Sequence, residues 1–115
     1  MDFINVLNQV NIKPETYLKK AKIKAQSLGL NYKTLKFSNA KHKKLSIRDD
    51  YNKLVNFGSS INGDYIIWSI FEKRRQVPQG FASKKQYVFW KSHTAMKYDK
   101  ENPYSANNLS LNILW

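Results

Sequence analysis

The stretch Asn31–Gly58, NYKTLKFSNAKHKKLSIRDDYNKLVNFG, decides the fold class, because its hydrophobic residues alternate with polar ones instead of recurring at helical spacing. The alternation is clearest at Leu45 and Ile47, which are separated by Ser46. Polar turns divide the stretch into three short runs of this kind. It therefore predicts a small antiparallel hairpin or three-stranded meander with one buried face, which helices must cover.

Helical patterns lie on both sides of this stretch. Pro14–Leu28 begins with a proline, carries an apolar stripe on one face and is followed by Gly29, which suits a helix end. Phe81–Lys97 is expected to form a second long helix. Asp64–Arg75 is apolar around the whole helical wheel, which is typical of a central buried helix, although a buried strand fits the same run. We expect an α+β fold in which several helices pack on the small sheet.

The size and composition of the chain fit one globular domain. It has 115 residues, of which 42% are hydrophobic and 24% are charged. We divide it into an N-terminal amphipathic arm, residues 1–12, and a single basic α+β domain, residues 13–115. The absence of cysteine excludes disulfides, thiolate catalysis and cysteine-bound zinc. No apolar run approaches the roughly 20 residues that span a bilayer, and the first residues do not have the pattern of a secretory signal, so no membrane contact is expected.

The charge of the chain is strongly unbalanced. Lysine and arginine number 20 against 8 aspartates and glutamates, which gives a formal net charge of +12. Such a charge repels itself within a small domain and is relieved by a polyanion. Only three of the basic residues are arginines, and arginine is the residue that reads guanine through paired hydrogen bonds. The composition therefore predicts binding to the phosphate backbone of nucleic acid with weak sequence preference.

Basic side chains gather in four places: the first long helix, the polar turn before Leu45, the end of the Asp64–Arg75 segment, and the second long helix. An exposed tyrosine within such a run can stack on a base, although a partly buried tyrosine is an equally good interpretation. The nucleic-acid-binding residues expected from this pattern are Lys19, Lys20, Lys22, Lys24, Lys41, Lys43, Lys44, Lys73, Arg74, Arg75, Lys84, Lys85, Tyr87 and Lys91.

Catalytic and metal chemistry find little support in the sequence. The two histidines, His42 and His93, are far apart, and the Asp49–Asp50 pair lies in an expected turn. No phosphate-binding glycine loop, nucleophile elbow or His-Glu helix motif occurs. We therefore expect a protein that is not an enzyme and needs no cofactor or metal. His42 is expected on the surface, and His93 is expected partly buried beside Phe89 and Met96, with a phosphate hydrogen bond as the alternative.

Several short segments, in the same order, resemble a family of small basic proteins. These proteins are encoded by large double-stranded DNA viruses of protists and algae and by their smaller virophage-like relatives. The resemblance runs from about Pro14 to Trp115, and Ala106 stands where the family often has a proline. The family has no established activity, so the resemblance implies a viral context and no mechanism. The segments that carry it are Gly29–Tyr32, Asn62–Ser69, Val77–Ala82, Trp90–Thr94 and Pro103–Trp115.

Two functions follow as hypotheses. The first is a non-enzymatic protein that binds nucleic acid, most simply double-stranded DNA, and organises or packages a viral genome. The alternative is a minor capsid or cement-type virion protein whose lysines contact acidic protein surfaces and whose apolar arm packs on partners. Both place the protein in a reducing intracellular compartment, in the host cytoplasm or a viral factory, or in the virion. The oligomeric state is left open.

The C-terminal segment is expected to pack on the rest of the domain. Ser105 is placed to cap a short helix, and the residues after it include Ile113, Leu114 and Trp115. A helix of about ten residues is marginal in water by itself. We therefore expect removal of residues 113–115 to destabilise the domain.

Overall fold

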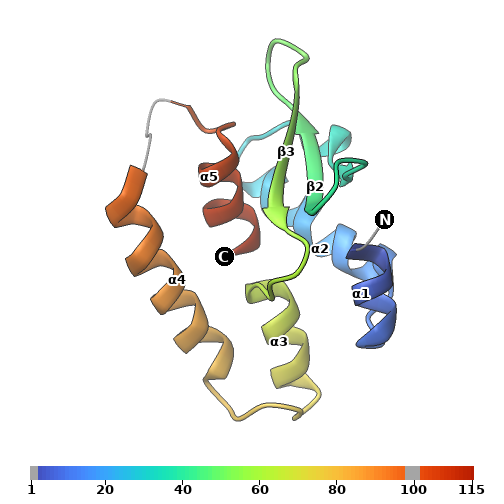
Figure 1. Cartoon of the computed structure of the whole chain (residues 1–115), viewed down its shortest axis with the longest axis vertical. Helices are drawn as coiled ribbons and strands as arrows, with labels where there is room; N and C mark the ends of the chain where they lie inside the picture. Colours follow the sequence, from blue (N-terminus) through green and yellow to red (C-terminus); the bar gives the residue numbers. More distant parts are fainter. Residues whose placement is uncertain (1–2, 98–101) are drawn as a thin grey trace.

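A computed structural model describes residues 3–97 and 102–115. In chain order the elements are α1 (Phe3–Gln9), α2 (Pro14–Ser27), the 3-10 turn η1 (Tyr32–Thr34), β1 (Lys36–Phe37), β2 (Lys43–Arg48), β3 (Leu54–Ser59), α3 (Tyr65–Lys73), α4 (Phe81–Lys97), α5 (Ala106–Leu109) and the π-helical turn η2 (Ser110–Leu114). Within these residues no helix is both long enough and apolar enough to cross a bilayer. Figure 1 shows strands β2 and β3 with helices on both sides of them, and α3 below them.

The sheet is an antiparallel meander in the order β1-β2-β3, which confirms the α+β expectation. Phe37 pairs with Leu45, and Leu45 pairs with Phe57, so an apolar row crosses the three strands. The expectation of a single buried face is wrong for β2. Lys44 and Ser46 point away from that row and are also buried. The second face is covered because η2 packs there: a Cβ atom placed on Gly58 would lie only 2.7 Å from Leu114.

The segment after Asn62 is a helix, which settles the choice between helix and strand. Asp64 caps α3 by accepting a hydrogen bond from the Ile67 amide at 2.9 Å. The expectation that this helix is central and fully buried is wrong. Only Ile66 and Ile67 are buried among its residues, because α3 lies at one end of the molecule, beside α4 (Figure 1). Its Trp68 ring meets the Phe81 ring of α4 edge to face at 5.1 Å.

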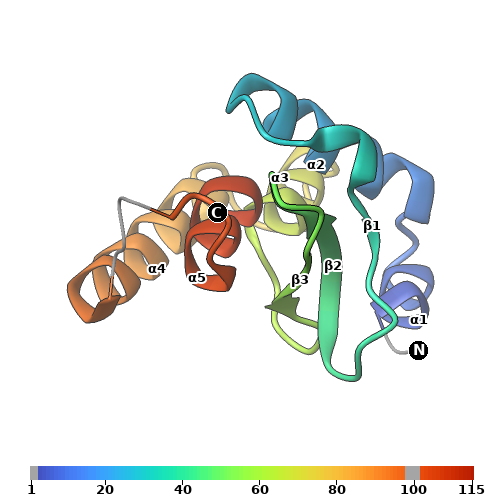
Figure 2. The same ribbon diagram turned by 90° about the horizontal axis from the view of Figure 1, so that it is seen from above.

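Helices at both ends of the chain complete the core. Figure 2 shows the strands between α1 on one side and α4 and α5 on the other. Phe3 of α1 is fully buried and meets the ring of Tyr17 from α2 edge to face at 4.9 Å. Ser105 caps α5 by accepting a hydrogen bond from the Asn108 amide, as expected, and the chain then continues as a π-helical turn. Trp115 is 8% exposed and belongs to the core.

A polar cluster is enclosed in this core. Oδ2 of Asp64 accepts hydrogen bonds from the Tyr17 hydroxyl at 2.5 Å and the Lys44 ammonium at 2.8 Å. All three side chains are buried. Burial raises the pKa of Tyr17 well above its usual value, and the charge and hydrogen bond of Asp64 raise it further. The cluster ties α2, β2 and the start of α3 to one carboxylate.

Candidate functional site

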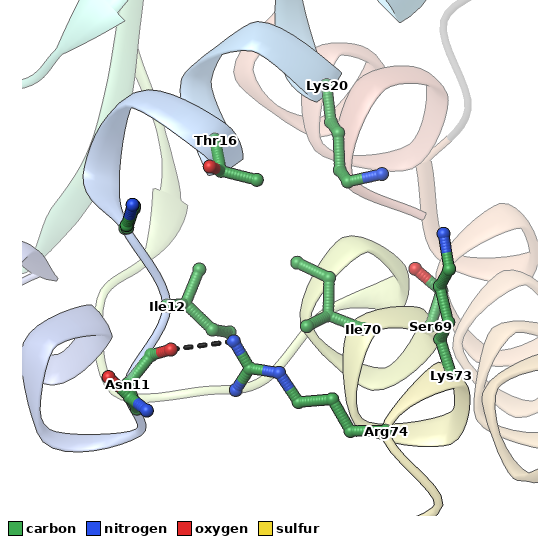
Figure 3. A pocket seen from close by; sticks show the side chains of 9 residues that line it. Asn11, Ile12, Thr16, Lys20, Ser69, Ile70, Lys73 and Arg74 are labelled. Carbon is green, nitrogen blue, oxygen red and sulfur yellow. Dashed lines mark hydrogen bonds between the residues drawn. The ribbon is translucent and has the colours of Figure 1, made fainter.

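A cleft of about 690 Å³ lies between the α1–α2 connection, α2 and α3. Figure 3 shows basic side chains reaching it from both helices. Four of its nine lining residues are cationic and none is acidic. The lining residues are Asn11, Ile12, Lys13, Thr16, Lys20, Ser69, Ile70, Lys73 and Arg74.

Residues one turn apart on α2 form the first wall. Lys13 precedes the helix, whose first residue is Pro14, and Thr16 and Lys20 follow at intervals of three and four residues. Lys24 continues this row, with its ammonium 5.6 Å from the centre of the Tyr65 ring of α3. Partial burial lowers the pKa of Lys24, and the charge of Asp64 opposes that shift. The regular spacing of a helix therefore aims a line of cations at α3.

The second wall comes from α3. Tyr65, Ser69 and Lys73 are four residues apart and so lie on one side of the helix, facing the row on α2. Ser69 donates its hydroxyl proton to the Ile66 carbonyl at 2.8 Å, which leaves its oxygen as an acceptor only. Lys73 is exposed at the end of the helix. The donors that remain for an anion on this wall are ammonium and guanidinium groups.

Arg74 closes the lower end of the cleft and also has a structural role. Its Nη1 donates to the Val10 carbonyl at 3.2 Å, and its Nη2 donates to the Asn11 carbonyl at 2.6 Å, a contact drawn in Figure 3. These carbonyls follow α1, where helix C-terminal oxygens lack partners within the helix. Arg74 therefore clamps α1 to α3, and only its remaining N–H groups are available to a ligand.

The carboxylates that the structure describes do not neutralise this cleft. Asp64 is buried with Lys44, and theirs is the one ion pair within 4 Å among residues 3–97 and 102–115. Glu72 of α3 accepts from the Ala82 amide at the start of α4, and Asp49 accepts from two amides of its own turn. Asp2, Asp99 and Glu101 lie outside the described residues. The cleft can therefore attract an anion without a competing carboxylate on its walls.

The cleft unites three of the residues expected to contact nucleic acid: Lys20, Lys73 and Arg74. Lys19 and Lys22 lie on another side of α2, around a shallow hollow that also includes Ile23. Their separation from Lys20 follows from the rotation of about 100° per residue along a helix. The basic residues of α2 thus serve two surfaces.

The expected contacts on α4 lie outside the cleft. Lys85 extends over the rings of Trp68 and Phe81, at 5.8 and 5.4 Å from their centres. Lys84 and Lys91 are exposed, and the Lys91 ammonium is 5.9 Å from the centre of the Tyr87 ring. Tyr87 is 65% exposed, which is the condition that stacking on a base requires.

Lys44 is the expected contact that the structure contradicts. Its side chain is 2% exposed and is held by Asp64, so it is not available to a phosphate on the surface. Its neighbours Lys41 and Lys43 are exposed, as is Arg75 after α3. Lys13 is a cleft residue that the sequence did not identify. Lys13 directly precedes the proline that starts α2, and this position at the helix start is the only feature of the sequence that could have indicated its role.

The two histidines lie in different surroundings. His42 is exposed in the hairpin turn, with a φ of 66°. His93 is partly buried, as expected, and stacks on Phe89 with ring centres 3.6 Å apart; the side chain of Met96 lies outside the described part of the structure. Within that part, no three His, Asp or Glu side chains gather as metal ligands would.

Comparison with known proteins finds no matching family model, no similar curated protein and no similar solved structure.

Proposed function

We propose that the protein binds nucleic acid through the phosphate backbone, with the cleft between α2 and α3 as its main contact. The observation that carries this proposal is the lining of the cleft. Two helices contribute Lys20 and Lys73 from opposite walls, Lys13 and Arg74 flank them, and no lining residue is acidic. Successive phosphates of a strand are anions that such a lysine-bordered cleft can follow.

The arrangement of the arginines supports weak sequence preference. Arg74 donates to the carbonyls after α1, and Nη1 of Arg48 donates to the Asn52 carbonyl at 2.9 Å. Two of the three arginines are therefore engaged with their own backbone and have fewer donors left for the edge of a guanine. The lysines that border the cleft are flexible point charges, which suit phosphates better than base edges.

With the viral resemblance of the sequence, the expected role is organisation or packaging of a genome. No catalytic step is part of this proposal. The competing function is contact with an acidic virion protein. In that case the protein should bind an acidic polypeptide more tightly than it binds nucleic acid.

The decisive experiment measures affinity for several duplexes of unrelated sequence across a salt series. Each neutralised phosphate releases counterions and contributes a slope of about −0.9 to log K against log salt. Occupation of the cleft by three or four phosphates predicts a slope of about −3 and similar affinity for every duplex. A flat salt response would reject the proposal. Tighter binding to poly-L-glutamate than to DNA would instead support the virion structural protein.

A further inference from the structure

A second cavity, of about 510 Å³, lies between the sheet, α4 and the C-terminal segment. It is formed by the turn before β2, the end of β3, the loop that follows, one side of α4, and the α5–η2 segment. His42, Lys43 and Asn62, which line it, are exposed, so the cavity reaches the surface. Its volume lies within the range of pockets that hold small organic ligands.

An aromatic stack forms one wall of this cavity. Phe89 lies between two rings: its centre is 3.6 Å from that of His93 and 4.3 Å from that of Trp115, with interplanar angles of 13° and 8°. All three residues line the cavity. Trp115 is almost completely buried, whereas His93 is partly exposed. The stack therefore ends, on the accessible side, at the imidazole ring of His93.

Hydrogen bonds hold this wall in place. Nδ1 of His93 lies 2.9 Å from the Phe89 carbonyl oxygen and 3.0 Å from the Ser92 hydroxyl, so the imidazole ring is held against its own helix. Gln86 donates to the Trp115 carbonyl at 2.5 Å and ties the C-terminal turn to α4. The rings are thus preorganised, and a planar ligand that extends the stack loses little conformational freedom of the protein.

Polar side chains also line the cavity. Asn62 supplies a side-chain amide with both donors and an acceptor, Lys43 supplies a cation near the opening, and none of the lining side chains is a carboxylate. A ligand that fits this combination is a flat aromatic ring with polar edges joined to a phosphate. A nucleotide has that chemistry.

We propose that this cavity takes an unpaired base of a bound nucleic acid, which stacks on the imidazole ring of His93 at the accessible end of the aromatic wall. The inference rests on the proposed function and adds to it a preference for strands with unpaired bases. A base must leave the duplex stack before it can enter such a cavity, and a single strand bears no such cost. The wild-type protein should therefore bind a single-stranded oligonucleotide more tightly than a duplex of equal length at equal salt.

The test compares His93→Ala with His93→Phe, which keeps a ring in the wall, and with Ser83→Ala, an exposed control on the same helix. Because one base-stacking contact is lost, His93→Ala should bind the single strand roughly five- to 150-fold more weakly than the wild type. Its affinity for the duplex should stay within about twofold of that of the wild type. His93→Phe should restore the single-strand affinity, and Ser83→Ala should not change it. Equal single-strand affinity of His93→Ala and wild type would overturn the inference.

A mononucleotide separates failure of this inference from failure of the proposed function. Adenosine monophosphate should bind the wild type, as measured by calorimetry, and should bind His93→Ala much more weakly. Mononucleotide binding without any oligonucleotide binding would support the cavity and reject the proposed function. Salt-dependent duplex binding without mononucleotide binding and without a single-strand preference would do the reverse.

Discussion

The ammonium of Lys44 lies 2.8 Å from the carboxylate of Asp64, and their side chains are 2% and 0% exposed. A lysine within a basic run of the sequence thus holds the interior together instead of contacting a partner. A third group, the hydroxyl of Tyr17, donates to the same oxygen. The other carboxylate oxygen accepts from the Ile67 amide, so both oxygens of this buried carboxylate have hydrogen-bond donors.

Lys44→Met should destabilise the domain strongly. The substitution keeps the length of the side chain and removes the charge that compensates Asp64, and breaking a buried pair in this way costs about 3–5 kcal/mol. The free energy of unfolding in urea measures the effect. Lys43→Met, at the exposed neighbouring position, is the control and should change it by less than about 0.5 kcal/mol. Equal stability of the two variants would contradict the burial of Lys44.

Tyr17→Phe should change how stability depends on pH in alkaline solution. The pKa of Tyr17 is raised in the folded state, so above about pH 10 the unfolded chain loses this proton before the folded chain does. The wild type therefore loses stability as pH rises above the pKa of the unfolded tyrosine. Below that pKa both states keep the proton, and the contribution of Tyr17 to stability is fully present. The loss should be smaller in Tyr17→Phe. Free energies of unfolding at about pH 9, 10 and 11, which bracket the reference pKa of tyrosine, measure this loss of stability. Tyr87→Phe, at an exposed position, is the control.

Arg74→Ala should loosen α1. It removes two hydrogen bonds to the carbonyls of Val10 and Asn11, each worth about 0.5–1.5 kcal/mol. Hydrogen exchange of the α1 amides should accelerate while that of β2 stays close to wild type. Lys73→Ala removes the neighbouring charge without either bond and should not produce this pattern. Uniform acceleration over the whole chain would contradict a local clamp.

The double variant Lys20→Ala/Lys73→Ala should weaken duplex binding and make its salt dependence shallower. Removal of two phosphate contacts predicts a slope less negative by about 1.8. Lys33→Ala/Lys53→Ala changes the net charge equally, at exposed positions outside the cleft. The two double variants are compared by titration at several salt concentrations. The same slope in both would mean that only net charge matters and that the cleft has no special part.

Removal of residues 113–115 should destabilise the domain, because Ile113, Leu114 and Trp115 are all buried in the core. Each fully buried large apolar side chain contributes roughly 1.5–3 kcal/mol, and a small domain has only about 5–15 kcal/mol in total. Thermal unfolding of the shortened chain should therefore occur at a much lower temperature. An unchanged melting temperature together with loss of self-association would identify the segment as an interface.

Local patterns in the sequence were sufficient for most elements of the fold, whereas the run at residues 64–75 fitted either a helix or a strand. Pro14 and Gly29 bracket α2, and the alternation around Leu45 and Ile47 produced β2. The predictions that were wrong concern how deeply an element or a side chain is buried. The apolar wheel of residues 64–75 predicted a central helix, yet burial of α3 depends on how many neighbours the tertiary arrangement provides, and its position at one end of the molecule provides few.

The candidate cleft was only partly predictable for the same reason. The sequence around Lys43 and Lys44 contains no feature that distinguishes the buried Lys44 from the exposed Lys43. The difference arises from Asp64, twenty residues later, which offers a carboxylate to one of them. Lys13 and Lys73 come together through the packing of α2 beside α3, a relationship that no spacing within one helix can reveal.

The shared carboxylate has a consequence for the order in which the chain can fold. Tyr17 and Asp64 are separated by 47 residues, and Lys44 and Asp64 by 20. An intermediate that collapsed α2 onto the strands before α3 arrived would enclose an ammonium and a hydroxyl with no acceptor, and such a species is high in free energy. Partly assembled forms are thereby disfavoured, and the first and second halves of the molecule must form together. We therefore expect the cluster to favour a single cooperative unfolding transition, with no populated form in which α3 is detached from the sheet.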